Sequence, residues 1–387
     1  MKIVHICLAC FYVEGMGYQE NLLPKYHVKQ GHQVTVLTND YSFNKNYKTE
    51  KKALKNYVNK DNVKVKVLNR TSRYGWYSRF GDYEGIIESL YEENPDVIFV
   101  HGGQFIGLKD VIKYCKNNRY VKLYIDQHAD YYNANIKSFK KKIAHKYIYG
   151  HWIRKACKYA ERFWGVTPWR CEFLKDVYSL PKKKIDLLVM GADDEYVDLK
   201  NKNNIRDKIR KQYDIKDDDF LIVTGGKIDK AKNILNLMQA INGKENVKLL
   251  VFGSLLEDAK QEFNDILSKS KNVIYIGWLD SNKVYDYFFS ADLVCFPGTH
   301  SVLWEQACAC KVPCLFKRWE GMEHVNNGGN SDFIDDVSSD GIRLKIEELL
   351  FTEKYYKMKE HAESEKTDIY LYSNIAKKSL ESYNANK

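Results

Sequence analysis

The sequence feature that most constrains the fold is an order of strand, glycine loop and helix that occurs twice. Residues 2–10 are an apolar run, a loop with two glycines follows, and residues 20–30 have the apolar spacing of a helix. The same order returns at residues 220–224, a Gly-Gly pair and residues 233–240. This order opens a doubly wound α/β domain, in which helices cover both faces of a parallel sheet. The sequence therefore predicts two successive α/β domains.

Apolar runs and helical segments continue to alternate through both halves. The predicted strands are residues 33–38, 62–68, 96–101, 121–126, 163–167, 185–190, 247–252, 273–276, 293–296 and 313–316. The predicted helices are residues 83–93, one long helix over 138–162, residues 168–177 and much of 342–382. A polar stretch from Gly191 to about Asn204 is typical of a linker. We place the domains at residues 1–190 and 191–365, and expect a helix within 366–387 that packs back on the first domain.

Charge and cysteine content bear on the compartment and the partners. The chain of 387 residues carries a formal charge of +10, which suits nucleic acid, an anionic membrane or phosphate-bearing substrates. Nine cysteines, an odd number, favour reduced thiols, and we expect Cys308, Cys310 and Cys314 in the core rather than on zinc. No signal-peptide cleavage pattern and no transmembrane run of apolar residues occurs, so we expect a cytoplasmic protein.

Polar residues gather where the predicted strands end. His101 and His128 follow strands of the first half, and Lys227, Gly253 and residues 297–305 follow strands of the second. Ligands of open α/β sheets bind beyond the carboxyl ends of the strands. This distribution predicts a cleft between two facing domains.

Two segments of the second half have the chemistry of a nucleotide site. Lys227 and Lys232 follow a strand and a Gly-Gly pair, so the backbone can approach a ligand while two ammonium groups neutralise a diphosphate. The alternative is two surface lysines at a helix start. Glu305 can accept hydrogen bonds from both hydroxyls of a ribose, and the alternative is an exposed glutamate in a first helical turn.

The first half offers one histidine with acidic neighbours. His128 lies in the segment IDQHAD and can bond a sugar hydroxyl or a phosphate, or can be a structural histidine. Asp126 and Asp130 flank it and can orient the ring or raise its pKa.

Taken in order, eight segments resemble glycosyltransferase family 4 and its GT-B relatives over nearly the whole chain. They are GMGYQENLLPKYHVKQGHQVTVLT, PDVIFVHGG, IDQHAD, GVTPW, VMGADDEY, GGKIDKAKN, VFGS and SADLVCFPGTHSVLWEQACACKVPCL. The resemblance implies a GT-B fold of two Rossmann-like domains, the first binding the acceptor and the second the nucleotide sugar. It also implies a retaining enzyme without metal or other cofactor, which transfers a hexose from a nucleotide-diphosphate sugar, a UDP-sugar being favoured.

The resemblance gives each matched position a role. His128 would contact the transferred sugar, and Lys227 and Lys232 would stabilise the departing diphosphate. The implied donor-binding residues are Gly15, Gly17, Gly225, Gly226, Gly253, His300, Ser301, Val302, Glu305 and Glu323. The candidates for acceptor binding are Tyr18, His101, Asp130 and Trp76.

The chain departs from the family pattern at two positions. The family has two glutamates eight positions apart in the loop before the ribose site, and Pro297 stands where the first would be. The loop is shortened, or His300 and Ser301 take over contacts with the donor hexose. Lys227 stands where the family usually has arginine, which keeps the charge but loses the bidentate fork.

A basic segment suggests a further partner. From Tyr131 to Ala160 there are eight Lys or Arg and no acidic residue. A buried apolar stripe is predicted at Ala144, Ile148, Trp152, Ala156 and Tyr159. The opposite side of residues 138–160 is either a solvated face or a contact with anionic lipid headgroups, which would make the protein peripheral at the inner face of the plasma membrane.

Other functions stay open at this point. A sugar-nucleotide epimerase of the same fold would need no acceptor, and a basic non-enzymatic protein would only bind anions. A dehydrogenase is disfavoured because the first glycine loop lacks the third glycine of the dinucleotide fingerprint. We expect no nucleic acid partner, since such a binder does not need polar strand ends in two α/β domains. The preferred hypothesis is an enzyme that adds a sugar to a bacterial cell-surface polysaccharide, on a sugar or lipid-linked acceptor.

Overall fold

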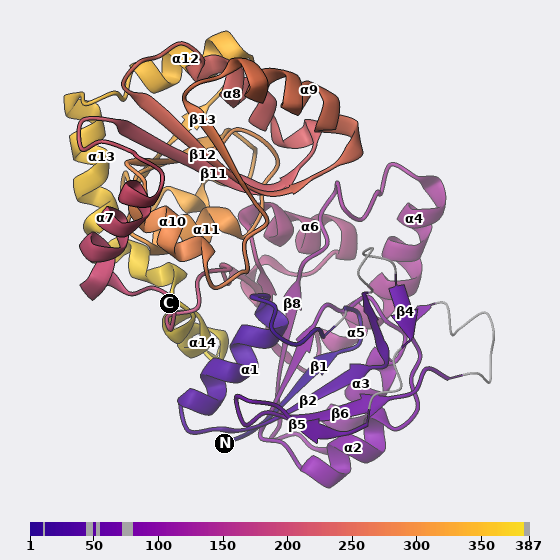
Figure 1. The fold of residues 1–387 in the computed structure, drawn as a ribbon. Helices are drawn as coiled ribbons and strands as arrows, with labels where there is room; N and C mark the ends of the chain where they lie inside the picture. The colour runs from indigo at the N-terminus through magenta and orange to yellow at the C-terminus, as the bar shows by residue number, and fades with distance from the viewer. Residues whose placement is uncertain (11, 44–48, 52–54, 72–79, 383–387) are drawn as a thin grey trace. The chain divides into compact units, whose positions relative to one another are not determined.

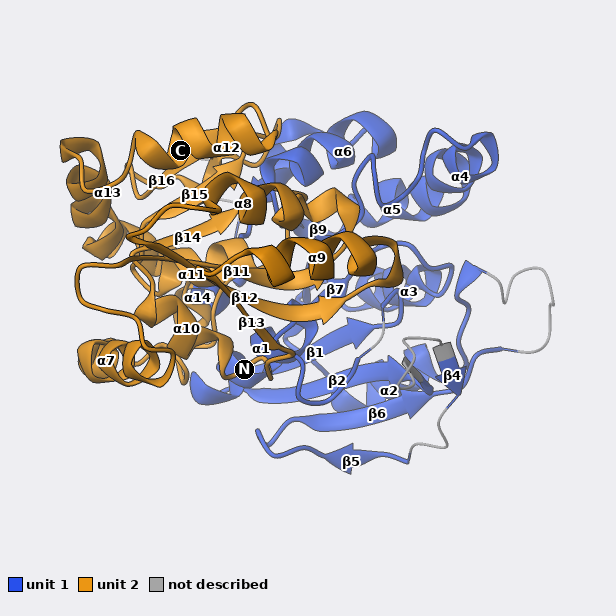
Figure 2. Ribbon diagram, turned by 45° about the horizontal axis from the view of Figure 1, so that its top comes forward, with its two compact units in different colours: residues 1–189, 375–387 blue, residues 190–374 orange. Residues whose placement is uncertain are grey.

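The computed structural model describes residues 1–10, 12–43, 49–51, 55–71 and 80–382. The chain divides into two compact units, coloured separately in Figure 2. Unit 1 comprises residues 1–189 and 375–387, and unit 2 comprises residues 190–374.

Unit 1 is built on an eight-stranded sheet in the order β10-β9-β8-β7-β1-β2-β6-β5, and all neighbouring strands are parallel except the edge pair β5 and β6. Its strands are β1 (Lys2–Cys7), β2 (Gln33–Asn39), β5 (Tyr57–Val58), β6 (Lys64–Leu68), β7 (Val97–His101), β8 (Lys122–Gln127), β9 (Ala160–Gly165) and β10 (Ile185–Leu187), with a separate hairpin of β3 (Tyr41–Phe43) and β4 (Thr49–Lys51). The central strand β7 is buried along its whole length, as expected of a parallel strand covered on both faces.

The helices of unit 1 follow the strands in the βα alternation that the sequence predicts (Figure 1). They are α1 (Gln19–Lys29), α2 (Ile86–Glu93), α3 (Leu108–Asn117), α4 (Phe139–Ile143), a π-helix (Ala144–Tyr149), α5 (Gly150–Ala156), α6 (Pro168–Tyr178), a 3-10 turn (Lys182–Lys184) and α14 (Tyr372–Ser379). Helix α3 was not predicted. Thr167 caps α6 by accepting a hydrogen bond from Arg170 N, and Pro168 occupies the first helical position, where its missing N–H costs nothing.

The single long helix predicted over residues 138–162 is wrong. The helical segment ends at Ala156, and β9 begins at Ala160. A π-helix interrupts the segment, and its wider turn shifts the side chains that follow. Of the predicted buried stripe only Ala156 is fully buried, while Ala144, Ile148, Trp152 and Tyr159 are half-buried. The other buried positions of the segment are His145, Gly150 and Ile153.

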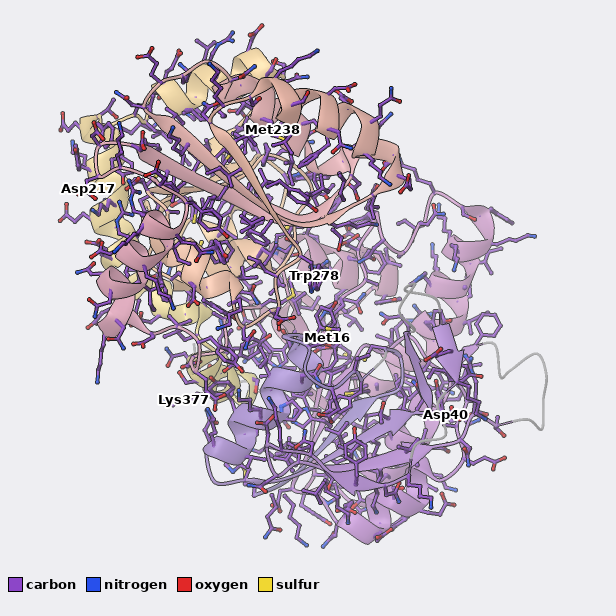
Figure 3. All side chains as sticks on the ribbon, viewed as in Figure 1. Met16, Asp40, Asp217, Met238, Trp278 and Lys377 are labelled. Carbon is purple, nitrogen blue, oxygen red and sulfur yellow. The ribbon has the colours of Figure 1, made fainter. Side chains whose placement is uncertain are left out.

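Unit 2 contains a six-stranded, all-parallel sheet in the order β13-β12-β11-β14-β15-β16. Its strands are β11 (Phe220–Ile228), β12 (Val247–Leu255), β13 (Val273–Gly277), β14 (Leu293–Phe296), β15 (Cys314–Lys317) and β16 (Ser331–Ile334). Its helices are α7 (Lys202–Gln212), α8 (Ile234–Ile241), α9 (Glu257–Lys269), α10 (Val284–Ser290), α11 (Leu303–Ala309), α12 (Ser339–Glu347) and α13 (Glu353–Glu363), with 3-10 turns at Leu199–Asn201, Lys230–Lys232, Glu323–Val325 and Glu365–Tyr370. Met238 on α8, labelled in Figure 3, is fully buried in the core of this unit.

Two details of unit 2 correct the sequence analysis. The linker predicted to run to about Asn204 ends earlier, because α7 begins at Lys202. The Gly-Gly pair 225–226 and Gly253 lie inside strands and not in loops, since β11 and β12 stay paired as far as Ile228 and Leu255. Close approach of the two backbones explains the glycines: a Cβ on Gly253 would lie 1.8 Å from the carbonyl oxygen of Gly226.

The last described residues return to unit 1. Helix α14 lies beside α1 (Figure 1), and His27 of α1 contacts Ala376 and Ser379. Tyr124 Oη and Trp164 Nε1 donate hydrogen bonds to the carbonyls of Leu380 and Ser379. Lys377, labelled in Figure 3, is exposed on the same helix.

The cysteine and membrane predictions can be compared with the described residues. Cys308, Cys310 and Cys314 are buried free thiols in the core of unit 2, as predicted. Among the helices in the described part of the chain, none is both long enough and apolar enough to cross a bilayer.

Candidate active site

The carboxyl end of β11 in unit 2 presents Lys232 on a tight turn. Asp229 caps this turn by accepting a hydrogen bond from Lys232 N at 3.1 Å. The Lys232 ammonium donates to the carbonyl oxygens of Thr299 at 2.5 Å and His300 at 3.5 Å. Burial lowers the pKa of Lys232 to about 8, with Asp229 opposing the shift. The turn thus holds a desolvated ammonium group against the loop that follows β14.

Gly298 makes this contact between turn and loop sterically feasible. A Cβ at Gly298 would lie 2.2 Å from Lys232 Cα and 2.4 Å from Lys232 O. The loop can therefore pass the turn only where it has no side chain. Lys227, the other predicted diphosphate ligand, instead has an exposed side chain 3.8 Å from Asp229.

Glu305 lies on α11 and is fully buried, so the alternative of an exposed glutamate is excluded. Its Oε1 accepts hydrogen bonds from His300 Nε2 and His324 Nε2, both at 2.8 Å. Burial favours the neutral carboxyl, but His300 and then His324 outweigh burial and lower the pKa of Glu305 to about 2. The second oxygen, Oε2, is buried and has no hydrogen-bond partner among the described residues. A carboxylate in this state can accept a hydrogen bond from a ligand.

His324 was missed in the sequence analysis, which named its neighbour Glu323. The structure exposes Glu323 at the start of a 3-10 turn, while His324 faces Glu305. The two contacting residues are 19 positions apart, and no spacing rule connects them. Ser301 and Val302, predicted to bind the donor, are half-buried in the loop between Gly298 and α11.

Asp126 is the centre of the polar cluster in unit 1. Its Oδ2 lies 2.8 Å from His101 Nδ1, 3.1 Å from Gln19 Nε2 and 3.3 Å from His128 Nε2. Its Oδ1 accepts from Gly102 N at 2.9 Å. Burial by itself favours the neutral carboxyl, but His128 and His101 hold the pKa of Asp126 well below its usual value. Asp126 is therefore a carboxylate with both oxygens occupied.

The two histidines beside Asp126 differ in exposure. His128 has a side chain that is 33% exposed, whereas the His101 side chain is fully buried. Burial lowers the pKa of each, and the charge of Asp126 more than compensates, so that the pKa of His128 is raised and that of His101 reaches about 9. The prediction that Asp126 raises the pKa of His128 is thus confirmed, and His128 is the histidine that a ligand can reach.

Two residues predicted to bind the acceptor are already engaged. His101 is buried, and its ring nitrogens contact Asp126 and His5, so the prediction of direct acceptor contact is wrong. Asp130 is 5% exposed, pairs with Arg170 at 3.1 Å and accepts from backbone N–H groups of its own turn. Asp130 therefore shapes the loop after His128 and does not orient that ring.

The remaining predicted residues lie around the first loop of unit 1. Gly15 and Tyr18 are exposed in the segment before α1, and Gly17 is half-buried there. Gly15 has a φ of +79°, a conformation that other residues rarely adopt. Trp76 lies outside the described residues.

Two clusters contain the atoms that metal ions prefer. They are His101, Asp126 and His128, and His300, Glu305 and His324, with ligand atoms within 4.8 Å of one another in each. In each cluster a carboxylate oxygen, of Asp126 or of Glu305, accepts hydrogen bonds from protonated ring nitrogens of the histidines. Asp217, at the edge of unit 2 in Figure 3, is an exposed residue in an acidic turn.

Comparison with known proteins agrees with this architecture. The family model described as Glycosyltransferase Family 4 matches residues 22–196, and that described as Glycosyl transferases group 1 matches residues 205–365. A lipopolysaccharide 1,2-N-acetylglucosaminetransferase of Salmonella typhimurium is 26% identical over 231 residues, which are 54% of this chain and 58% of that protein. A processive diacylglycerol alpha-glucosyltransferase of Acholeplasma laidlawii is 24% identical over 217 residues, 49% of this chain and 64% of that protein. The matches thus span less than two thirds of the length of either relative.

Solved structures share the fold at low sequence identity. A glycosyltransferase from Rickettsia africae has a TM-score of 0.69 at 16% identity and covers 100% of this chain and 99% of its own. Alr3699/HepE of Anabaena, solved with UDP and glucose, has a TM-score of 0.65 at 15% identity, with 98% of each chain covered. A UDP-GlcNAc 2-epimerase from Neisseria meningitidis, solved with UDP-GlcNAc, has a TM-score of 0.61 at 15% identity and covers 98% and 99%.

Two parallel-sheet units with this likeness define the GT-B fold class, as the sequence predicts. Because the two family models cover successive halves of the chain, the protein belongs to the family-4-like glycosyltransferases of the GT-B type.

Proposed function

We propose that this protein is a retaining glycosyltransferase that moves a hexose from a nucleotide-diphosphate sugar to a sugar or lipid-linked acceptor. Two observations in unit 2 carry the proposal: the Lys232 ammonium is held at the loop carbonyls of Thr299 and His300, and Glu305 Oε2 has no hydrogen-bond partner among the described residues. A diphosphate near Lys232 favours its charged form, and a ribose hydroxyl can donate a hydrogen bond to the buried carboxylate oxygen. A nucleotide diphosphate supplies both groups.

The donor in this proposal is a UDP-sugar. Alr3699/HepE, whose fold this chain shares, was solved with UDP and glucose. His300, Ser301 and Val302 would line the hexose site in the shortened loop, since Pro297 replaces the first glutamate of the family pattern. Gly225, Gly226 and Gly253 would allow the β11 and β12 backbones to approach the nucleotide.

In the proposed mechanism the protein stabilises the leaving diphosphate without a metal. Lys232, with Lys227 at the rim, would neutralise the negative charge that develops as the bond to the sugar breaks. His128 in unit 1 would hydrogen-bond the transferred sugar, and Gly15, Gly17 and Tyr18 would contribute the first loop to the substrates. The acceptor would belong to a bacterial cell-surface polysaccharide pathway.

Thermal-shift measurements test the donor class. We expect one nucleotide diphosphate among UDP, GDP and ADP, with CMP as a further comparison, to raise the melting temperature in EDTA, because a ligand that binds only the folded state stabilises it. UDP is the expected ligand. Stabilisation that appears only with Mg²⁺ or Mn²⁺ would contradict the metal-free mechanism, and no stabilisation by any of them would contradict the transferase proposal in favour of a non-enzymatic anion binder.

An epimerase is the second candidate, because the fold of this chain is also that of the UDP-GlcNAc 2-epimerase from Neisseria meningitidis. Incubation with the stabilising sugar nucleotide alone separates the two. A transferase leaves the sugar configuration unchanged and at most hydrolyses the donor slowly, whereas an epimerase produces the second epimer without an acceptor. Detection of the epimer by NMR would replace the first proposal by the second.

The location proposed for the enzyme is the inner face of the plasma membrane. Phe139, Ile143 and Tyr147 recur every four residues along α4 and the π-helix, and all three are exposed. The exposed lysines beside them are Lys140, Lys141, Lys142 and Lys146. Apolar side chains flanked by lysines are typical of helices that lie on an anionic bilayer.

Vesicle flotation tests the membrane proposal. Replacing Lys140 and Lys141 by Gln should weaken binding to phosphatidylglycerol vesicles at least tenfold, at about 1 kcal/mol for each lysine. Lys182 and Lys183, exposed on the 3-10 turn of the same unit, provide the matched control pair. An equal loss of vesicle binding in both variants would show that binding depends only on the net charge of the protein. That result would contradict a membrane-binding face on α4 and the π-helix.

A further inference from the structure

A row of three buried histidines extends from Asp126 to the C-terminal helix of unit 1. His101 Nδ1 lies 2.8 Å from Asp126 Oδ2, and His101 Nε2 lies 2.9 Å from His5 Nδ1. His5 Nε2 lies 3.0 Å from His27 Nδ1. His27 Nε2 then lies 3.2 Å from the carbonyl oxygen of Ala376. We call His5, His27 and His101 the histidine row, and every ring nitrogen in it is hydrogen-bonded.

Five different elements supply the row and its two ends. His101 ends β7 beside Asp126 of β8, and His5 lies on the neighbouring strand β1. His27 comes from α1, and Ala376 comes from α14. The His5 and His101 rings are joined through His5 Nδ1 and His101 Nε2, with centroids 5.2 Å apart and planes only 17° from parallel. All three side chains are between 0% and 1% exposed, so the row is shielded from water.

In the arrangement that makes every contact of the row a hydrogen bond, both ends accept hydrogen bonds. Asp126 is a carboxylate that also accepts from Gly102 N and Gln19 Nε2. At the other end, the carbonyl oxygen of Ala376 has no hydrogen. Ser379 Oγ, 3.0 Å from His27 Nε2, donates its own hydrogen to Ala376 O at 2.8 Å and so also accepts from His27.

The number of hydrogens in the row follows from these two ends. Four hydrogen bonds join the three imidazoles to each other and to the terminal acceptors. Each bond needs one hydrogen on a ring nitrogen, and a neutral imidazole carries only one. Three neutral rings supply three hydrogens for four bonds, so all four bonds form together only when one ring is an imidazolium.

We propose that the histidine row holds this one excess proton at neutral pH, and that the resulting cation, acting through Asp126, positions His128 for transfer. The proposal rests on the proposed function only in its second half. The positive ring keeps Asp126 ionised, and the Asp126 carboxylate in turn lies 3.3 Å from His128 Nε2. His5, His27 and His101 are positioning residues, because none of them is exposed to a substrate.

Electrostatics locates the proton on His101. Burial opposes the charge, but Asp126, with smaller contributions from Cys7 and Glu20, raises the pKa of His101 to about 9. Burial lowers the pKa of His27 to about 3 and holds that of His5 well below its usual value. The other titratable groups that face the row or Asp126 are His32, Cys10 and His128.

Two substitutions of His27 separate the hydrogen count from the mere presence of a polar side chain. In His27→Phe the row has two histidines and two bonds, so both rings can be neutral. In His27→Gln the amide can keep the same arrangement, with Oε1 accepting from His5 and Nε2 donating to Ala376, and in that arrangement an imidazolium is still needed. His145→Phe is the control, because His145 is a buried histidine of unit 1 outside the row, bonded to Tyr178 Oη.

The measurement is imidazole NMR of the full chain with ¹⁵N-labelled histidine from pH 6 to 10. In the unsubstituted protein, one ring should carry two protons up to about pH 8, and two rings should stay neutral. His27→Phe should lower the proton affinity of His101 about tenfold or more, one pKa unit, while His27→Gln and His145→Phe leave it unchanged. Three neutral rings at pH 7 in the unsubstituted protein, which needs no variant to fold, would overturn the row.

An equal fall in the proton affinity of His101 in His27→Phe and His27→Gln would overturn the hydrogen count. So would an unchanged proton affinity in both variants. The positioning role has its own readout. The pH above which kcat declines should move down in His27→Phe together with the His101 pKa, with the Kd of the donor unchanged. A shift in the NMR titration without a shift in the kcat profile would overturn the link to His128. A protein without transferase activity would contradict the proposed function and leave the NMR result standing.

Discussion

Both units have a carboxylate between two histidines near the ends of their strands. The two carboxylates differ in how many of their oxygens are hydrogen-bonded. In unit 1, both oxygens of Asp126 are occupied by four groups of the protein. In unit 2, Oε1 of Glu305 accepts hydrogen bonds from His300 and His324. Its other oxygen, Oε2, is buried and has no hydrogen-bond partner among the described residues. The difference separates a carboxylate that organises its surroundings from one that is available to a ligand.

The two strand ends also differ in what fills them. Unit 1 places imidazole side chains on β1 and at the end of β7, and they carry a proton that Asp126 stabilises. Unit 2 brings backbone against backbone at Gly253 and Gly298, and the half-buried ammonium of Lys232 lies beside the loop. The first arrangement is sensitive to protonation, and the second is sensitive to any added side-chain atom.

The largest expected effect tests the close backbone approach in unit 2. Gly253→Ala would place a Cβ 1.8 Å from Gly226 O, at a φ of +120°. It should lower the free energy of unfolding by about 3 kcal/mol or more, because strain and overlap add. Gly243→Ala has a similar positive φ but no atom within 4 Å, and should cost only about 1 kcal/mol. Urea denaturation measures the free energy of unfolding of both variants. Equal losses of this free energy would show that the positive φ, and not the overlap with Gly226, destabilises Gly253→Ala.

The pH dependence of stability should have opposite signs in the two units. The pKa of His101 is raised from 6.5 to about 9, so its contribution is complete below pH 6.5 and is lost as the pH rises through 9. At 1.36 kcal/mol for each pKa unit, unit 1 loses about 3 kcal/mol. The pKa of Lys232 is lowered to about 8, so unit 2 gains stability from pH 8 towards 10.5. Hydrogen exchange at pH 6, 8 and 10, followed separately in each unit, measures the two stabilities. A change of both stabilities in the same direction would contradict the comparison.

The charge of Lys232 should dominate the chemical step. Lys232→Ala is expected to reduce kcat by about a hundredfold, because the departing diphosphate loses a desolvated positive charge. Lys230→Ala, an exposed lysine in the same turn, is the control and should keep kcat within about twofold. Steady-state assays with the donor found by thermal shift measure both variants. Unchanged turnover in Lys232→Ala would remove this residue from the diphosphate site.

The smallest effect concerns the free oxygen of Glu305. Glu305→Gln should weaken donor binding about tenfold, since a charged acceptor for the ribose hydroxyls is replaced by a neutral one. Glu320→Gln changes an exposed neighbour by the same atoms and should leave the Kd unaltered. Calorimetric titration with the donor measures the Kd of both variants. An equal Kd in the two variants would show that the ribose does not bind at Glu305.

The parts of the site that the sequence predicts are those carried by local pattern. Lys232 follows a strand and its glycines, and Glu305 begins a helix after a short loop, so both could be located from strand ends and family resemblance. His324 could not, because it reaches Glu305 from a separate turn 19 residues further on. The long helix failed for a related reason: the spacing of its apolar residues fits an α-helix, and the π-helix that shifts them has no sequence signature.

The sequence by itself determined the two α/β units, the order of strands and helices, and the family, because apolar periodicity and glycine positions are local properties of the chain. Only the tertiary structure decided which polar residues are buried together. His27 and Ala376, which are in contact, are 349 positions apart. His5, His27, His101 and Ala376 come from four elements, and each pattern taken alone is that of an ordinary strand or helix. Their hydrogen bonds, and the proton that these require, exist only because the parallel sheet and the returning C-terminal helix bring those elements into contact.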